Sequence, residues 1–351
     1  MVVRTHRNRY VPSGPFAWNR FARLRLSSGL IGLGFMSVGV SATEPAKTVG
    51  PNACAECHKQ EAEAWTLTHH FKTFRDMPRN KDANGIADKL GMKRVKSEPL
   101  CLTCHFTVQQ KDGREEPVAG ISCESCHSSG ADWVKGHGGY SGKTEKTETK
   151  EEADARWKLA DSKGMIRPRD LYALAKNCYS CHVVPQEKLV NVGGHTAGSK
   201  FELVSWSQGE VLHNTWYSKG KENVAANAAR KRMLYLVGLG VELETALRAV
   251  GQSTARKTYA FEMAKRADQA RKQLAAAAKA AANVPELKTI VQLGYSAGLK
   301  LNNDRALTAA ADGISKQVAS LTEKYDGSTL AAIDNLIPGP DKIKGTPRKT
   351  N

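Results

Sequence analysis

Apolar residues recur with helical spacing over the last third of the chain. Leucine and valine stand at steps of three and four residues from Leu236 to Val250, and a similar stripe runs from Leu307 to Leu321. Such steps place apolar side chains on one face of an amphipathic helix. The alanine-rich sequence from about Ser253 to Ala282 has the same pattern and predicts another helix between the two.

Start and stop signals complete this helical region. Asn283, with Pro285 in the first turn and Glu286 three residues later, predicts the start of a further helix. Short connections and many alanines let neighbouring helices run antiparallel and close together. The sequence therefore predicts an α-helical bundle over residues 221–336 and a flexible tail over residues 337–351.

The composition changes before this bundle. Every Cys, and every His beyond residue 42, falls between Cys54 and His213. Pro and Gly residues in this part predict loops, and a helix is expected from Gln60 to Phe74. Residues 141–155, rich in Lys, Thr and Glu, are expected to form a solvated insertion, with a docking surface as the alternative. The fold class predicted is mainly α with little regular sheet.

Four copies of Cys-x-x-Cys-His contain every cysteine of the chain. This is the attachment motif of c-type haem, in which two thiols form thioethers with the porphyrin and the adjacent histidine binds iron. Zinc sites of four thiolates, or disulfides, are alternatives, but neither requires a histidine after every second cysteine. The sequence therefore predicts four covalently attached haem c groups. The attachment residues are Cys54, Cys57, Cys101, Cys104, Cys123, Cys126, Cys178 and Cys181, and the proximal iron ligands are His58, His105, His127 and His182.

The second axial ligand of each iron decides whether a haem only transfers electrons or also binds a substrate. Five further histidines are candidates, and the adjacent His69 and His70 point about 100° apart on a helix, so only one of them is expected to bind iron. Methionine at helical spacing, as at Met233 and Met263, is more typical of a helix core. The distal ligands predicted are one of His69 and His70, together with His137, His195 and His213.

About 45 residues per haem are available in residues 43–220, too few for a conventional hydrophobic core around each one. The porphyrins are therefore expected to form the core of a tetrahaem domain over residues 43–220.

The first 42 residues have the pattern of an export signal. Arginines without acidic residues precede an apolar run from Leu26 to Val40 and a small-residue cleavage site ending at Ala42. An uncleaved membrane anchor and a basic nucleic-acid arm are the alternatives, although the apolar run is short for a bilayer span. We expect a signal peptide over residues 1–42 and a periplasmic protein, with membrane contact only if this segment stays as an anchor.

The net charge of +17 includes six arginines of this segment, so the remainder carries +11. The propionates of four haem groups would add eight negative charges to this total. The charge therefore predicts no nucleic-acid partner, and steering towards an acidic redox protein stays a hypothesis.

Two blocks of this sequence resemble the tetrahaem cytochrome c-554 family of periplasmic carriers. One runs from Gly120 to Gly130, followed by Trp133 and His137, and the other joins the first motif to Trp65, Thr68 and His70. The resemblance covers about residues 50–215 and implies closely stacked and perpendicular haem pairs, with His70 favoured over His69 as the ligand. Ser128 and Ser129 stand where the family often has Gly-Pro, and the helical region after residue 220 has no counterpart.

These observations favour a tetrahaem electron carrier between periplasmic or membrane-bound redox proteins of a respiratory chain. No side chain is predicted to be catalytic. One alternative is an oxidoreductase in which a five-coordinate haem acts on a small nitrogen or sulfur compound. Another is a haem-bearing subunit that docks onto a larger respiratory complex through its helical domain.

Overall fold

A computed structural model describes residues 43–350. The predicted signal peptide lies outside the described residues. The mainly α fold is confirmed, because the described part of the chain has a single two-stranded antiparallel sheet beside its many helices. Its strands are β1 (Thr107–Lys111) and β2 (Arg114–Ala119), paired from Thr107 opposite Ala119 to Lys111 opposite Arg114.

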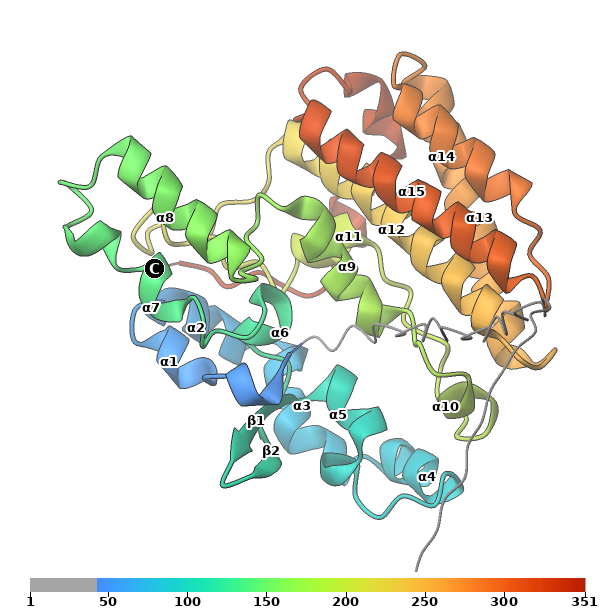
Figure 1. The fold of residues 1–351 in the computed structure, drawn as a ribbon, viewed down its shortest axis with the longest axis horizontal. Coiled ribbons are helices and arrows are strands. Elements are labelled where there is room, and N and C mark those ends of the chain that lie inside the picture. Colours follow the sequence, from blue (N-terminus) through green and yellow to red (C-terminus); the bar gives the residue numbers. More distant parts are fainter. Residues whose placement is uncertain (1–42, 351) are drawn as a thin grey trace, which may run out of the picture. The chain divides into compact units, whose positions relative to one another are not determined.

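The first part of the chain consists of short helices joined by loops (Figure 1). The α-helices there are α1 (Pro51–Ala55), α2 (Lys59–Thr66), α3 (His69–Asp76), α4 (Lys81–Lys89), α5 (Pro99–His105), α6 (Cys123–His127), α7 (Val134–His137), α8 (Lys150–Ser162), α9 (Leu171–His182), α10 (Glu187–Asn191) and α11 (Leu203–Ser207). The short 3-10 helices of the described residues are η1 (Pro45–Lys47), η2 (Met77–Arg79), η3 (Val95–Ser97), η4 (Tyr140–Gly142), η5 (Ala331–Leu336) and η6 (Pro340–Lys342).

Three of the four motif histidines end a helix. His105 is the last residue of α5, His127 of α6 and His182 of α9, whereas α1 ends between the two cysteines of the first motif. A helical turn brings the two cysteines of a motif and its histidine to neighbouring positions. The helix ends therefore present the attachment residues together.

The single helix expected from Gln60 to Phe74 is wrong, because the structure has two helices there. α2 ends at Thr66, and Thr68 begins α3 as its N-cap, since its hydroxyl accepts a hydrogen bond from the Phe71 amide at 3.2 Å. A threonine at an N-cap satisfies an amide that would otherwise lack a partner. The break places His69 and His70 in the first turn of α3.

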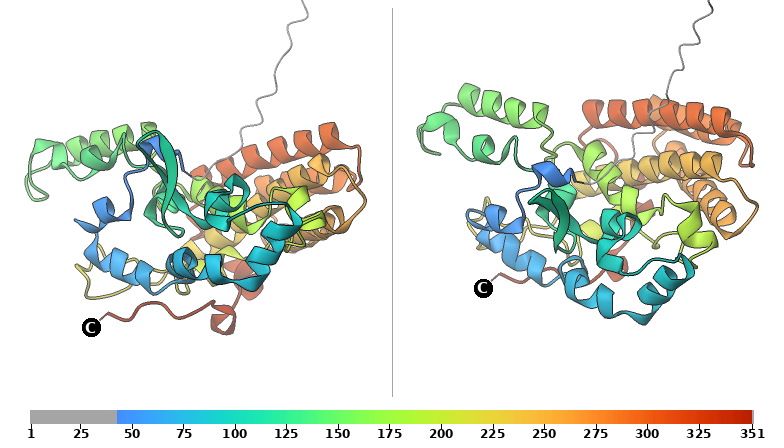
Figure 2. Two further views of the ribbon diagram at one scale, coloured as in Figure 1. Left: turned by 90° about the horizontal axis from the view of Figure 1, so that it is seen from below. Right: turned by 60° about the horizontal axis from the view of Figure 1, so that its bottom comes forward.

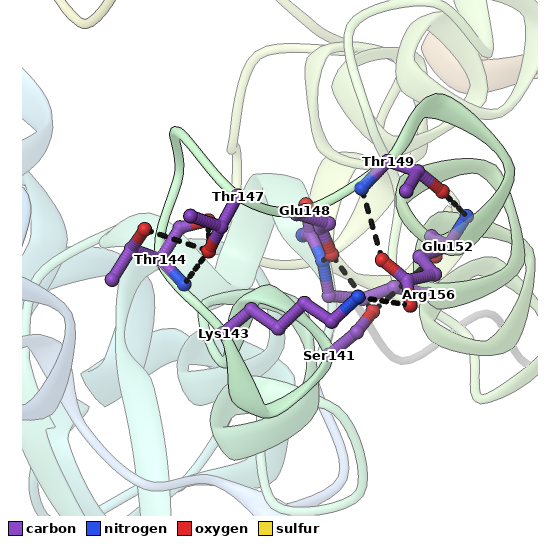
Figure 3. A network of polar contacts seen from close by, with 8 residues as sticks. All are labelled: Ser141, Lys143, Thr144, Thr147, Glu148, Thr149, Glu152 and Arg156. Atoms are coloured by element: carbon purple, nitrogen blue, oxygen red, sulfur yellow. Dashed lines mark hydrogen bonds and ion pairs between the residues drawn. The ribbon is translucent and has the colours of Figure 1, made fainter.

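The Lys-, Thr- and Glu-rich stretch is exposed up to Thr147, as expected for a solvated insertion, but its end is ordered. Thr149 and Glu152 form a capping box that starts α8 at Lys150. Arg156 of this helix pairs with Glu148 at 2.6 Å (Figure 3), and the two side chains are only 9% and 5% exposed. The pair closes residues 141–148 onto α8.

The long helices of the second part are α12 (Ala228–Gln252), α13 (Thr258–Ala280), α14 (Pro285–Ser296) and α15 (Asp304–Lys324). α12 packs against α13 and α15, and both views of Figure 2 show α12 and α15 alongside each other. The helix starts predicted near Ser253 and Asn283 agree with α13 and α14 to within a few residues.

The predicted apolar stripes are buried, but α12 is buried on more than one face. Its residues from Met233 to Val241 are all buried, because α9 and α11 cover the side away from the bundle. One hydrophobic cluster therefore extends from Leu171 of α9 through the bundle to Ile333. The domain boundary expected at residue 220 stays a prediction, and this cluster lies on both sides of it.

The last residues contact the first part of the chain. The backbone of Lys344 bonds to Ser205 at 3.0 Å and to Glu210 at 2.9 Å, and the Arg348 guanidinium donates to the Gln60 side chain at 2.7 Å. Across the described residues, none of the helices combines the length and apolar character that a membrane crossing requires.

Candidate haem-binding sites

The eight motif cysteines are free thiols. The Cys54 thiol interacts with that of Cys123, and the Cys104 thiol interacts with that of Cys181, without a disulfide in either pair. No group of three or more His, Cys, Asp or Glu side chains in the described residues has the arrangement of a metal site.

Each motif histidine faces one histidine from outside the motifs. His69 is absent from these pairs. The distances between ring centres are 6.1 Å for His58 and His137, 6.3 Å for His70 and His182, 6.2 Å for His105 and His195, and 6.2 Å for His127 and His213.

These separations fit two imidazoles bound to one iron. A metal–imidazole bond is about 2 Å long and the ring centre lies about 1.1 Å beyond the nitrogen, so two ligands on opposite sides place their ring centres about 6.3 Å apart. Ordinary contacts between aromatic rings span about 4.5–7 Å between centres, so the recurrence of nearly one value at all four motifs is the informative observation. The four pairs therefore have the spacing of bis-histidine iron sites.

The hydrogen bonds of these histidines favour the tautomer that binds iron through Nε2. In His127, Nδ1 lies 2.8 Å from the carbonyl oxygen of Ile166. Three of the distal histidines have a similar contact between Nδ1 and a backbone carbonyl. A carbonyl only accepts, so Nδ1 carries the hydrogen and Nε2 keeps its lone pair for a metal. The distal contacts are His137 to the Val134 carbonyl at 2.7 Å, His195 to that of Thr196 at 2.6 Å, and His213 to that of Val211 at 2.6 Å.

Burial keeps several of these imidazoles neutral. It lowers the pKa of His105 to about 4, with His195 and His70 adding to the effect. Burial, His70 and Arg266 lower the pKa of His182 to about 3. The pKa of His70 is also lowered, chiefly by burial. Only the neutral form of histidine binds a metal, so these surroundings favour ligation near neutral pH.

His69 has a different environment from His70. Its side chain is 84% exposed and its Nδ1 lies 2.7 Å from a carboxylate oxygen of Glu210. The structure thus places His70, and not His69, opposite a motif histidine. Met233 and Met263 are buried in the core of the bundle.

His137 is held in place by α7 and α8. The Arg156 guanidinium, which pairs with Glu148, donates to the His137 carbonyl. Trp133 packs edge-on against the His137 ring, 5.2 Å between centres, and its buried indole N–H has no hydrogen-bond partner. A haem propionate next to His137 is the type of acceptor that this orphaned donor needs. The residues present therefore fit a haem group at this pair.

His58 faces a carboxylate. Its Nδ1 lies 3.7 Å from Glu61, whose other oxygen accepts from the Thr215 hydroxyl at 2.5 Å. Burial opposes ionisation of Glu61, but the interactions with His58 and Thr215 prevail and lower the pKa of its carboxyl group to about 2. An ionised carboxylate next to Nδ1 orients a ligating imidazole and makes it more basic.

Glu124, within the third motif, is a structural residue that the sequence reasoning missed. Its side chain is fully buried, and it accepts backbone hydrogen bonds from Val49 at 2.9 Å, Gly50 at 2.8 Å and Gly130 at 2.7 Å. These bonds join the start of α1 to the loop after the third motif. The only signal for this role in the sequence is an acidic residue inside a motif turn. Glu56 of the first motif shares that signal, although its side chain is exposed.

The sequence was also compared with known proteins. A family described as cytochrome c554 and c-prime matches residues 53–128. Cytochrome c-554 of Nitrosomonas europaea is 29% identical over 125 residues, which cover 33% of this chain and 53% of that protein. The chain thus spans about half the length of this relative, and no solved structure matches it. The motif-bearing part of the chain is similar to cytochrome c-554. Residues 53–128 match the family of that protein, whose members are c-type cytochromes with covalently bound haem iron.

Proposed function

We propose that this protein is a tetrahaem c-type cytochrome that transfers electrons between redox proteins. The observation that carries the proposal is the pairing of all four motif histidines with a second histidine at 6.1–6.3 Å. The proposed ligand pairs are His58 with His137, His105 with His195, His127 with His213, and His182 with His70.

Haem iron would supply one-electron redox chemistry at each site. The motif cysteines would hold each group covalently, and the two histidines would occupy both axial positions. No position then remains for a substrate on any of the four irons. The pairing therefore supports an electron carrier over an oxidoreductase with a five-coordinate haem.

The contacts between motifs support an order for the four sites. The Cys54–Cys123 contact joins the first motif to the third, and the Cys104–Cys181 contact joins the second to the fourth. The Asn177 side chain donates to the Ser125 and Cys126 carbonyls, both at 2.9 Å, so α9 ties the third motif to the fourth. We propose the spatial order first, third, fourth, second. In this order, each site is joined to the next by a direct contact between residues in or next to the motifs, which supports electron exchange along the row.

The cellular setting follows from the attachment chemistry. Haem is joined to Cys-x-x-Cys-His motifs outside the cytoplasm, and residues 1–42 have the pattern of an export signal. We propose a periplasmic protein whose partners are periplasmic or membrane-bound redox proteins. The basic charge of the chain is compatible with an acidic partner surface.

Two measurements on the purified full-length protein test the proposal. A pyridine haemochrome assay should return four haem groups per chain, and electron paramagnetic resonance of the oxidised protein should show low-spin ferric iron alone. A high-spin signal at full occupancy of one site, altered by cyanide, would instead support the oxidoreductase. Clearly fewer than four haem groups would contradict the proposal as a whole.

A further inference from the structure

The fourth motif histidine has surroundings that come from outside its own motif. Nδ1 of His182 lies 2.6 Å from the Ser199 hydroxyl, and its ring stacks on Phe201 with 4.2 Å between centres and 18° between planes. When Nε2 binds a metal, Nδ1 carries the hydrogen and the Ser199 oxygen accepts it. Ser199 and Phe201 thus fix the orientation of this ring.

The segment that carries Ser199 is pressed against the end of α9. Gly198 pairs with Val183 in a β-bridge and has a φ of +134°, and a Cβ at Gly198 would lie 2.3 Å from the His182 carbonyl oxygen. Only glycine permits this approach and this conformation. Ser199 is therefore held at a fixed place beside His182.

The helical bundle holds the same segment from the other side. Arg266 of α13 donates to the Ser199 carbonyl at 2.7 Å, and its guanidinium lies 3.0 Å from Glu242 of α12. The side chains of Arg266 and Glu242 are only 14% and 15% exposed. Ion pairs in such surroundings are weakly screened by water and salt. By comparison, Nδ1 of His127 contacts a backbone carbonyl, that of Ile166.

We propose that the helical bundle sets the reduction potential of the fourth haem site through two positioning residues, Arg266 and Ser199. This inference rests on the proposed function, in which His182 binds haem iron. An acceptor on Nδ1 makes the imidazole a stronger electron donor and favours ferric iron. A nearby cation favours the ferrous state, which carries one positive charge less. The two residues therefore act on the potential in opposite directions.

Redox titration of the full-length protein, followed by its absorption spectrum, tests these directions. Ser199→Ala should raise one of the four midpoint potentials, and Ser199→Thr, which keeps an oxygen, should restore it. Arg266→Gln keeps an N–H group that can donate to the Ser199 carbonyl but removes the positive charge and leaves Glu242 unpaired. It should therefore lower one midpoint potential, and Arg266→Lys should recover most of the shift. Ser199→Ala leaves the Arg266–Glu242 pair intact, so it stays informative if Arg266→Gln fails to fold.

Arg271→Gln is the matched control, because Arg271 lies on the same helix and forms its own ion pair, with Asp268 at 2.6 Å. It should leave all four potentials unchanged. The inference is overturned if Ser199→Ala leaves every potential unchanged in a protein with four haem groups, or if Arg266→Gln shifts all four equally. A wild-type protein with a high-spin site would contradict the proposed function instead, before any variant is compared.

Discussion

At the scale of single residues, His69 and His70 are neighbours with different expected roles. His70 faces His182, whereas His69 is exposed and bound to Glu210. We predict that His70→Ala converts one of four low-spin haem groups to high spin, because the iron loses its sixth ligand. His69→Ala should leave the electron paramagnetic resonance spectrum unchanged. A high-spin signal from His69→Ala and none from His70→Ala would reverse the assignment.

Glu124 supports a second prediction at this scale. Glu124→Gln replaces one carboxylate oxygen by an NH₂ group that faces a backbone N–H, so a buried amide loses its acceptor. Hydrogen bonds to a charged group contribute about 1.5–3 kcal/mol each, so the free energy of unfolding should fall by about 3 kcal/mol. Denaturant unfolding followed by far-UV circular dichroism measures this change.

The control for this variant is Glu56→Gln. Glu56 lies inside the first motif, one position later than Glu124 does in the third, and it is exposed. Its replacement should change the free energy of unfolding by less than about 0.5 kcal/mol. Equal losses in the two variants would show that the buried carboxylate of Glu124 is not what stabilises the loops.

The sequence identifies the proposed iron ligands directly. The chemistry of haem attachment fixes the spacing within each motif, and the supply of histidines limits the distal candidates. Glu124, Ser199 and Arg266 could not be found in this way. Their roles depend on contacts between segments distant in the chain, such as the 67 residues that separate Arg266 from Ser199, and such contacts leave no periodic signal.

At the scale of helices, close packing of α12 depends on residues without side chains. A Cβ at Gly240 would lie 2.5 Å from a methyl group of Val318 in α15. Overpacking of this kind costs about 1–3 kcal/mol, more than the gain of about 1 kcal/mol from the better helix propensity of alanine. We predict that Gly240→Ala lowers the free energy of unfolding by up to about 2 kcal/mol.

Gly85 of α4 provides the matched comparison for this prediction. A Cβ there would meet nothing within 4 Å, so only helix propensity should change. Gly85→Ala should therefore raise the free energy of unfolding by up to about 1 kcal/mol. Stabilisation by both variants in thermal or denaturant unfolding would mean that α12 and α15 tolerate a larger separation.

Helix prediction from the apolar pattern succeeded where one face decides the structure. The stripes of α13 and α15 are buried as expected, because each of these helices has one side in solvent. It failed between Gln60 and Phe74, where the N-cap of Thr68 breaks a continuous pattern. It also could not reveal that α12 is buried on several faces, because a stripe on one face says nothing of what covers the others.

At the scale of the whole molecule, the change in composition near residue 220 does not coincide with a gap in the core. α9, which ends in the fourth motif, packs against α12, and Leu171, Ala175 and Tyr179 belong to the same hydrophobic cluster as the bundle. Without the bundle these side chains would be exposed, and Ser199 would lose its contact with Arg266. Burial of such side chains contributes about 1.5–3 kcal/mol each.

We therefore predict that a protein truncated after residue 220 incorporates fewer than four haem groups. The fourth site depends on α9, and the second site shares the Cys104–Cys181 contact with it. The first and third sites lie on α1, α6 and α7, whose main contacts are with one another and with α2, α8 and α9, so they should be affected least. Haem content per chain and the Soret spectrum measure the loss. A truncated protein that folds with four low-spin haem groups would instead establish residues 43–220 as an independent domain. The bundle would then affect only the reduction potential of the fourth haem site.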